Sequence, residues 1–139
     1  MYKRQIHASL IQQKYPDAEI AISLPRIRPT HGADESLIFK NIIDDKKFFQ
    51  ILLVIRMFLP YASITLSTRE SRDFRNLAVK YAATKVSASV DTSIGHRSKK
   101  SENGGGSQFE IDDKRSTDDV VNDLNNIGMT AVFTDYINL

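Results

Sequence analysis

The sequence has no cysteine among its 139 residues and little excess of charge of either sign, with a net charge of +2. The lack of cysteine excludes disulfide bonds and thiolate metal sites within this chain, and it agrees with a reducing, cytoplasmic environment. Basic residues cluster only at Arg97-Ser98-Lys99-Lys100. One short basic cluster gives little support for nucleic-acid binding, so we expect no nucleic-acid partner.

Long hydrophobic runs are also missing. The longest apolar run extends from Phe48 to Leu59 and is broken by Gln50 and Arg56. A membrane-spanning helix needs about 20 apolar residues, so this run predicts a buried helix and no membrane association. The first residues, MYKRQ, lack the apolar segment of a signal peptide, and we expect a cytoplasmic protein.

Apolar periodicity predicts an α/β domain in which helices and strands alternate. With 41% hydrophobic and 26% charged residues, the composition is that of a globular domain. Alternation with a period of two predicts strands at 19–25, 63–68 and 85–90. Helical spacing predicts helices at 6–15, 46–59, 72–82 and 116–127. Strands separated by helices imply right-handed crossovers and a parallel sheet.

Capping residues mark the ends of the expected helices. Asp44 or Asp45 can cap the second helix, which is apolar on most sides and is therefore expected to be well buried. Ser71 is an N-cap signal before the third helix. Ser116 and Asp119 resemble a capping box before the fourth helix, and Gly128 is a signal for its end.

Each expected strand carries aliphatic side chains on one face and small or hydroxyl side chains on the other. In the second strand, Ile64 and Leu66 alternate with Ser63, Thr65 and Ser67. The aliphatic face of the third strand would consist of Val86, Ala88 and Val90. The aliphatic faces should meet the crossover helices. The hydroxyl face then either faces water, in a sheet covered on one side, or lines the hydrated lumen of a (β/α)8 barrel.

Charged side chains follow the first two strands and favour the barrel. Arg26 and Arg28 follow the first strand, and Arg69 and Glu70 follow the second. Active sites of parallel α/β folds lie at the carboxyl ends of the strands. An arginine there can bind a carboxylate through two parallel hydrogen bonds. In the competing interpretation, Arg69 is a surface residue at a helix start, paired with Glu70 or Asp73.

Three segments of the chain resemble, in the same order, the C-terminal part of the radical S-adenosylmethionine (SAM) aromatic amino acid lyases: ISLPRIRP (22–29), RMFLPYASITLSTRESRDFR (56–75) and QFEIDDKRSTDDVV (108–121). Within that family, the resemblance points to the tyrosine lyases that form the thiazole of thiamine. It implies an α/β fold made of the last three βα units of a (β/α)8 barrel. The hydroxyl faces of the strands would then point into the lumen.

The resemblance also implies an activity and its cofactors. Members of the family use a [4Fe–4S] cluster to reduce SAM to a 5′-deoxyadenosyl radical. The radical acts on L-tyrosine, whose Cα–Cβ bond breaks to give 2-iminoacetate (dehydroglycine) and p-cresol. Thiazole synthase would be the downstream partner.

The resemblance implies roles for particular residues as well. Arg69 matches the arginine that holds the amino acid group of the substrate. Ser87 matches a position that lines the same pocket, and Ser67 is expected beside it. The residues expected at the mouth of the pocket, towards SAM or substrate, are Arg26, Arg28 and Glu70.

Two departures from the family pattern limit what this chain can do. The family binds its cluster through a CxxxCxxC motif, which is absent here, and only Gly95 remains of two adjacent glycines that follow the last strand in relatives. A complete barrel needs about 250 residues. We therefore interpret residues 6–139 as the C-terminal part of one barrel domain, with a flexible loop at 97–107, and residues 1–5 as non-native sequence. Without the cluster-binding part, the chain alone should be inactive.

Three alternatives remain open at this stage. The first is the hydrogenase-maturation tyrosine lyase, which continues into a further cluster-binding domain containing CxxC. The second is a relative that cleaves tryptophan. The third is a free-standing α/β module that binds a carboxylate or phosphate through Arg69.

No metal site is expected from the other polar residues. The histidines, His7, His31 and His96, lack ligand-like spacing. Acid pairs occur at 44–45, 112–113 and 118–119. Each pair lies at an expected helix start or turn, where capping and dipole effects of about 0.5–2 kcal/mol explain it without catalysis.

Overall fold

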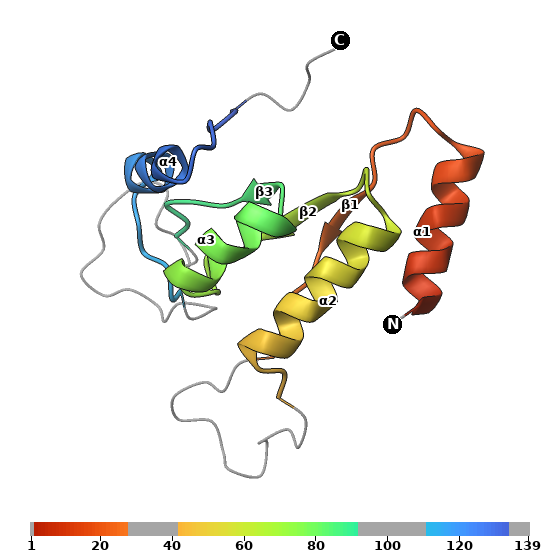
Figure 1. Cartoon of the computed structure of the whole chain (residues 1–139), viewed down its shortest axis with the longest axis horizontal. Helices are drawn as coiled ribbons and strands as arrows, with labels where there is room; N and C mark the ends of the chain where they lie inside the picture. Colours follow the sequence, from red (N-terminus) through yellow and green to blue (C-terminus); the bar gives the residue numbers. More distant parts are fainter. Residues whose placement is uncertain (1, 28–41, 92–110, 134–139) are drawn as a thin grey trace.

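The computed structural model describes residues 2–27, 42–91 and 111–133. Helices and strands alternate along the chain as the sequence predicts (Figure 1). The elements are α1 (Tyr2–Lys14), β1 (Ala21–Ser23), α2 (Asp45–Phe58), β2 (Ser63–Leu66), α3 (Arg72–Tyr81), β3 (Lys85–Val86) and α4 (Thr117–Asn126). Residues 2–5, interpreted above as non-native sequence, belong to α1, and that interpretation stays a prediction.

The strands form a parallel sheet in the order β1-β2-β3, so the predicted topology is confirmed. Ile22 lies opposite Ile64 in the register of β1 and β2, and Leu66 lies opposite Val86 in that of β2 and β3. The strands are shorter than the alternation predicts. β3 ends at Val86, and further along the expected strand Ser89 takes a positive φ of 50° and leaves the extended conformation.

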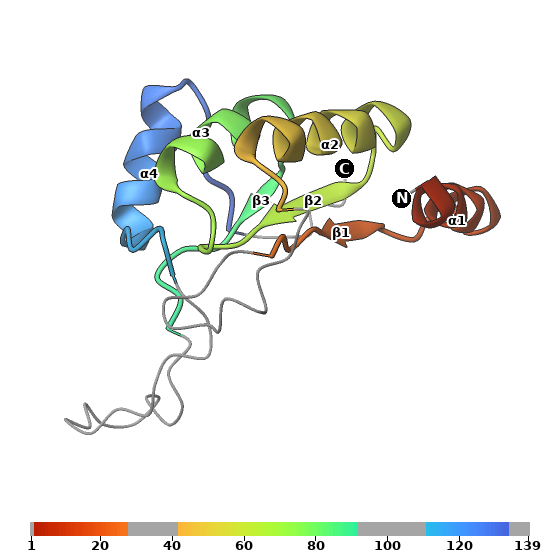
Figure 2. The ribbon, with the colours of Figure 1, turned by 90° about the horizontal axis from the view of Figure 1, so that it is seen from below.

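The helices α2, α3 and α4 lie on one side of the sheet, and α1 lies beside its β1 edge (Figure 2). The aliphatic face of the sheet meets this helical layer, as expected: Ile64 and Leu66 are 0% and 1% exposed. The core between sheet and helices consists of Phe48, Leu52, Ile55, Ile64, Leu66, Phe74, Ala78, Ala82 and Ala83. Within it the rings of Phe48 and Phe74 stack with centroids 5.4 Å apart.

The helix ends are built as their sequences predict. Asp44, rather than Asp45, is the N-cap of α2, and Ser71 is the N-cap of α3. Ser116 and Asp119 form a reciprocal capping box at the start of α4. Beyond α4, Gly128 has a φ of 78°, and its amide donates to the Asn125 carbonyl at 3.0 Å. The next amide, of Met129, donates to the Leu124 carbonyl at 2.9 Å, which completes a Schellman motif.

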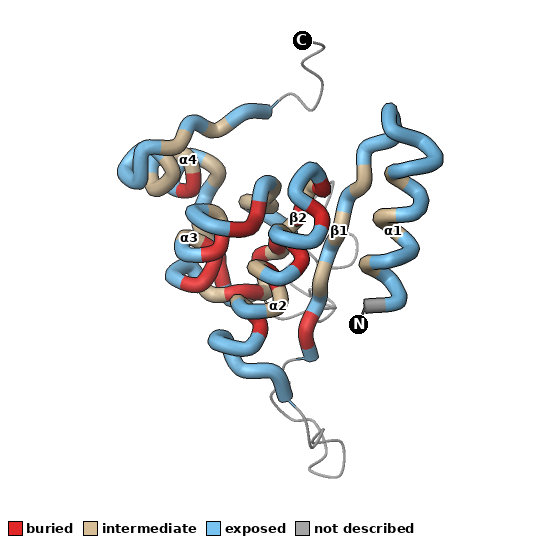
Figure 3. Tube along the Cα trace, turned by 45° about the vertical axis from the view of Figure 1, so that its right-hand side comes forward, coloured by how far each residue is buried: buried red, intermediate tan, exposed pale blue. Residues whose placement is uncertain are grey.

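The expectation that α2 is well buried is wrong for half of its surface. Its buried residues occupy one stripe, whereas Val54, Met57 and Phe58 are exposed within the described part of the chain (Figure 3). The apolar side of α1 is exposed too, including Ile6 and Leu10. Apolar periodicity predicts which side of a helix is apolar, but burial depends on whether a neighbouring element covers that side. No helix in the described ranges combines the length and apolar character that crossing a membrane requires.

Candidate functional site

A pocket of about 260 Å³ lies at the carboxyl ends of the three strands, where the sequence places a binding site. Its lining residues are Ser23, Leu24, Pro25, Ser67, Thr68, Arg69, Ser87, Val90 and Ile111. The wall combines hydroxyl groups, aliphatic side chains and one arginine. Such a mixture suits a small ligand with an apolar body and a polar, negatively charged end.

Three predicted site residues, Ser67, Arg69 and Ser87, meet in this pocket. They come together because β2 and β3 run parallel: the Ser87 amide donates to the Leu66 carbonyl at 3.2 Å, which places Ser87 beside the end of β2. Ser67 Oγ accepts a hydrogen bond of 3.4 Å from the Arg69 amide and so bends the chain after β2. Each of the three residues is half-buried in the described structure.

One predicted strand position is wrong. Val90 was expected on the aliphatic face with Val86, but it lines the pocket together with Ser87. Val86 does pack against the core. The positive φ of Ser89 lies between these positions and ends the alternation of faces. The pocket therefore gains an apolar wall that a continuous strand would not provide.

The segment before α4 closes another side of the pocket. The amides of Asp112 and Asp113 donate to the Thr68 carbonyl at 3.1 and 2.9 Å, so this segment is joined to the end of β2. Ile111, directly before them, lines the pocket. The third segment that carries the family resemblance thus reaches the site through backbone hydrogen bonds.

Arg26 and Glu70, predicted at the mouth, bind each other instead of lining the pocket. Their side chains are each 5% exposed, and Arg26 Nε donates to both carboxylate oxygens of Glu70 at 3.1 and 3.0 Å. Burial lowers the pKa of Arg26, but hydrogen bonds and charge from Glu70 and Asp45 outweigh it, and the net shift is upward. Arg28 lies outside the described residues. A role for these residues towards SAM or substrate stays a prediction.

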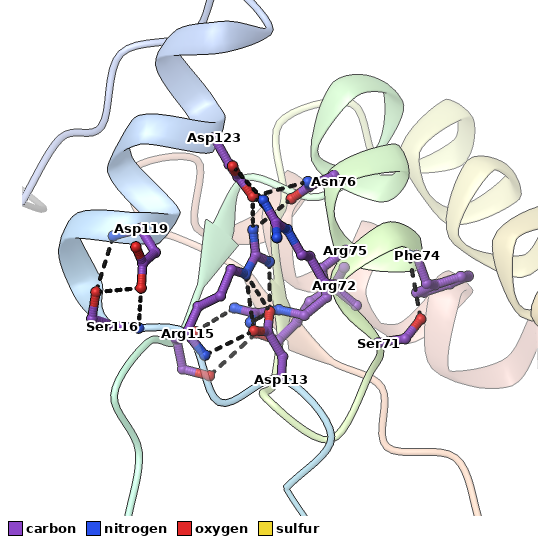
Figure 4. Close-up of polar contacts among 12 residues, drawn as sticks. Ser71, Arg72, Phe74, Arg75, Asn76, Asp113, Arg115, Ser116, Asp119 and Asp123 are labelled. Carbon is purple, nitrogen blue, oxygen red and sulfur yellow. Dashed lines mark hydrogen bonds and ion pairs between the residues drawn. The ribbon is translucent and has the colours of Figure 1, made fainter.

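A second buried ion network, which the sequence analysis missed, joins α3 to the segment before α4 (Figure 4). Arg75 is 1% exposed and binds Asp113, which is 4% exposed, and it also donates to the carbonyl of Ser87. Arg115 Nε donates to the two carboxylate oxygens of Asp113 at 2.9 and 3.1 Å. The capping explanation of the 112–113 pair is therefore incomplete for Asp113: its carboxylate accepts the Arg115 amide at 3.1 Å, as a turn cap does, but it also holds two arginines.

Burial, hydrogen bonds and neighbouring charges together shift the pKa values of this network. Burial raises the pKa of Asp113, but hydrogen bonds from Arg115 and the charges of Arg75 and Arg115 outweigh it and lower the pKa to about 2. Burial lowers the pKa of the Arg75 guanidinium. On the exposed side, a hydrogen bond from Arg72 lowers the pKa of Asp123. Asp113 and Asp123 thus remain ionised at neutral pH and hold α3 and α4 together.

One signal in the sequence could have revealed this network. Arg75 precedes Ala78 by one helical turn and Ala82 by two, so it lies on the apolar side of the third helix. An arginine in such a position is buried only with a partner. The partner, Asp113, is distant in sequence, and no local pattern identifies it.

The residues of this chain do not fit an iron–sulfur cluster. Such clusters are ligated by cysteine thiolates, and the sequence has none. Within the described ranges, no group of three or more His, Asp or Glu side chains is arranged to hold a metal ion.

The chain matches known proteins over most of its length. Residues 23–130 match the Biotin and Thiamin Synthesis associated domain, BATS. The chain is 34% identical to 2-iminoacetate synthase of Escherichia coli K12 over 89 residues, which are 64% of this chain and 23% of that protein. It is 29% identical to 2-iminoacetate synthase of Salmonella typhimurium LT2 over 130 residues, which are 94% of this chain and 33% of that protein. The chain therefore spans a third or less of the length of these curated relatives.

Solved structures with the same arrangement include two of HydG. A crystal structure of HydG, a maturase of the [FeFe]-hydrogenase, matches 93% of this chain and 27% of HydG with a TM-score of 0.76 at 32% identity. The structure of HydG from Carboxydothermus hydrogenoformans matches 90% of this chain with a TM-score of 0.66 at 30% identity. The match covers 27% of that HydG chain. The predicted fold, part of a parallel α/β barrel, is thereby confirmed, as is the resemblance to a portion of 2-iminoacetate synthase. The chain belongs to the BATS domain family.

Proposed function

We propose that this chain is the C-terminal, substrate-holding part of a radical SAM lyase that cleaves the Cα–Cβ bond of L-tyrosine to 2-iminoacetate and p-cresol. The product 2-iminoacetate would pass to thiazole synthase for the thiazole of thiamine. The relatives named 2-iminoacetate synthase support this activity. The observation that carries the proposal is the position of Arg69, beside two serine hydroxyls in a pocket at the carboxyl ends of parallel strands.

In this proposal Arg69 binds the carboxylate of tyrosine through two parallel hydrogen bonds. Ser67 and Ser87 line the same pocket and supply hydroxyl groups for the polar end of the substrate. Leu24, Val90 and Ile111 add apolar surface. Fixing the amino acid group holds the Cα–Cβ bond in one orientation, which favours cleavage of that bond over others.

The iron–sulfur cluster of the proposed reaction belongs elsewhere in the complete enzyme. This chain has no thiolate for a [4Fe–4S] cluster. We therefore assign the cluster to residues outside the chain. Its own contribution is to bind and orient tyrosine, and the chain alone should form no product.

The test is the Arg69→Ala variant of the complete, cluster-loaded enzyme supplied with SAM and L-tyrosine. We expect p-cresol formation to be lost while the iron and sulfide content stays at the wild-type level. Arg72→Ala is the matched control, because Arg72 lies nearby but is exposed and pairs with Asp123. Unchanged turnover of Arg69→Ala would refute the proposed role of Arg69.

A second candidate is the hydrogenase-maturation branch of the tyrosine lyases, and the match to HydG structures favours it. That branch carries a further cluster-binding domain with a CxxC motif. The two candidates differ in the number of clusters in the complete protein. Iron analysis showing one cluster per chain would support the thiazole branch, and two clusters would support the maturation branch.

A further inference from the structure

A buried ion pair joins the end of β1 to the loop that carries Arg69. Arg26 follows β1, and Glu70 lies in the loop between β2 and α3. Arg26 Nε donates to both Glu70 carboxylate oxygens at 3.1 and 3.0 Å, and Arg26 Nη2 also binds Glu70. Hydrogen bonds from two guanidinium nitrogens restrict the carboxylate to one orientation.

Arg26 is itself held from several sides. Arg26 Nη1 donates to the carbonyl of Ile43 at 3.1 Å, and Nη2 binds the Asp45 carboxylate at the first turn of α2. The guanidinium carbon lies 5.0 Å from the ring centroid of Phe48 and 5.3 Å from that of Phe74. Arg26 is therefore anchored to the core and to α2, and it forms a rigid support for Glu70.

The loop from Ser67 to Ser71 is short, so fixing Glu70 also fixes its neighbour Arg69. The Glu70 amide donates to the Ser67 carbonyl at 3.4 Å, and the Arg69 amide donates to Ser67 Oγ at 3.4 Å. Ser71 then caps α3. Adjacent Cα atoms are only 3.8 Å apart. A displaced Glu70 would therefore move the backbone from which Arg69 projects.

We propose that Arg26 and Glu70 are positioning residues, which hold the Arg69 loop in the orientation needed to bind the substrate carboxylate. This inference rests on the proposed function. Neither residue lines the pocket, so their effect on the substrate passes through Arg69. The competing explanation is that the pair only stabilises the fold, and the experiment separates the two.

The first experiment compares Glu70→Gln with Glu19→Gln in the complete enzyme. Glu19 is a matched control, because it pairs with Lys85 at the other end of the sheet and is half-exposed. We expect Glu70→Gln to raise KM for L-tyrosine about tenfold or more. Tyramine is tyrosine without the carboxylate, so Arg69 has no group to bind in this inhibitor. We therefore expect the inhibition constant of tyramine for Glu70→Gln to stay within about twofold of the wild-type value. Equal weakening of tyrosine and tyramine would overturn the proposal.

A second variant keeps the test meaningful if Glu70→Gln folds poorly. Arg26→Met/Glu70→Leu removes both charges, and replacing a whole buried pair by apolar side chains usually restores stability. Met and Leu cannot form the directional hydrogen bonds that orient the loop. We expect the unfolding midpoint to recover while KM for tyrosine stays raised. If the unfolding midpoint and KM for tyrosine both returned to their wild-type values, the pair would have a purely structural role.

Hydrogen exchange separates failure of this inference from failure of the proposed function. A wild-type enzyme that forms no p-cresol would refute the function but would leave the loop to be tested. In the 139-residue chain, Glu70→Gln should speed amide exchange at Arg69 and Glu70 about tenfold or more relative to wild type, whereas Glu19→Gln should not. Unchanged exchange at both amides would overturn the positioning role.

Discussion

The two faces of the sheet are made by the same strands but have different surroundings. On one face of β2, Ile64 and Leu66 are buried beneath the helices and are 0% and 1% exposed. On the other face, Ser63 and Thr65 of β2, and Ser67 directly after it, are half-buried. One face therefore contributes apolar burial to stability, and the other carries hydroxyl groups, of which that of Ser67 lines the pocket.

This difference indicates how the fold separates stability from recognition. Substitutions on the helical side should change the free energy of unfolding and affect binding only as a consequence. Substitutions on the pocket side should affect binding with little cost in stability. The buried ion network around Asp113 serves both purposes. It holds helices together, and it also contacts the backbone of Ser87 in the pocket wall.

The largest effect on stability is expected in the helical layer. Leu52 is fully buried, so Leu52→Ala should reduce the free energy of unfolding by about 2–5 kcal/mol through lost burial and a cavity. Urea unfolding of the 139-residue chain measures the change. Val54→Ala, in the same helix but 50% exposed, is the control and should cost far less. Equal losses would show that the outer side of α2 is also covered.

An intermediate effect is expected for the ion network and depends on pH. The pKa of Asp113 is lowered to about 2, below the value of an unfolded aspartate. Its ionisation therefore stabilises the fold by about 2 kcal/mol above about pH 4, and this contribution is lost as the pH falls towards 2.

Asp113→Asn tests this pH dependence. The variant should be less stable than wild type at pH 7, and its stability should change less between pH 4 and about pH 2. Urea midpoints across that pH range measure the effect. Parallel pH profiles for wild type and variant would contradict the assignment to Asp113.

The smallest effect on stability is expected on the pocket face. Ser67→Ala should change the free energy of unfolding by less than about 0.5 kcal/mol, yet it should raise KM for L-tyrosine in the complete enzyme. Ser63→Ala is the control, because Ser63 lies on the same face at the opposite end of β2 and donates to Glu19 at 2.6 Å. A loss of stability without a change in KM would remove the proposed distinction between the faces.

The sequence predicts most of the fold because the relevant signals are local. Period-2 alternation identifies three strands, and capping side chains such as Ser71 and Ser116 bind amides within one helical turn. The kink at Ser89, inside the strand expected to reach Val90, is not predicted, because no glycine or proline marks it. For the same reason Val90 was placed on the wrong face.

The site is predicted only in part. Ser67, Arg69 and Ser87 follow from their positions along parallel strands and from the family resemblance. Arg75 and Asp113 were missed, because their pairing joins residues far apart in the chain. The sequence predicts charges near the pocket mouth at Arg26 and Glu70, but not that the two side chains bury each other.

By itself, the sequence determined the order of helices and strands, the apolar side of each, and the absence of any thiolate ligand. These properties depend on residue identity and on spacing within one or two turns. Tertiary structure alone decided which charges pair and which apolar sides are covered. A buried arginine is stable only beside a carboxylate, and whether one lies there depends on how distant segments pack together.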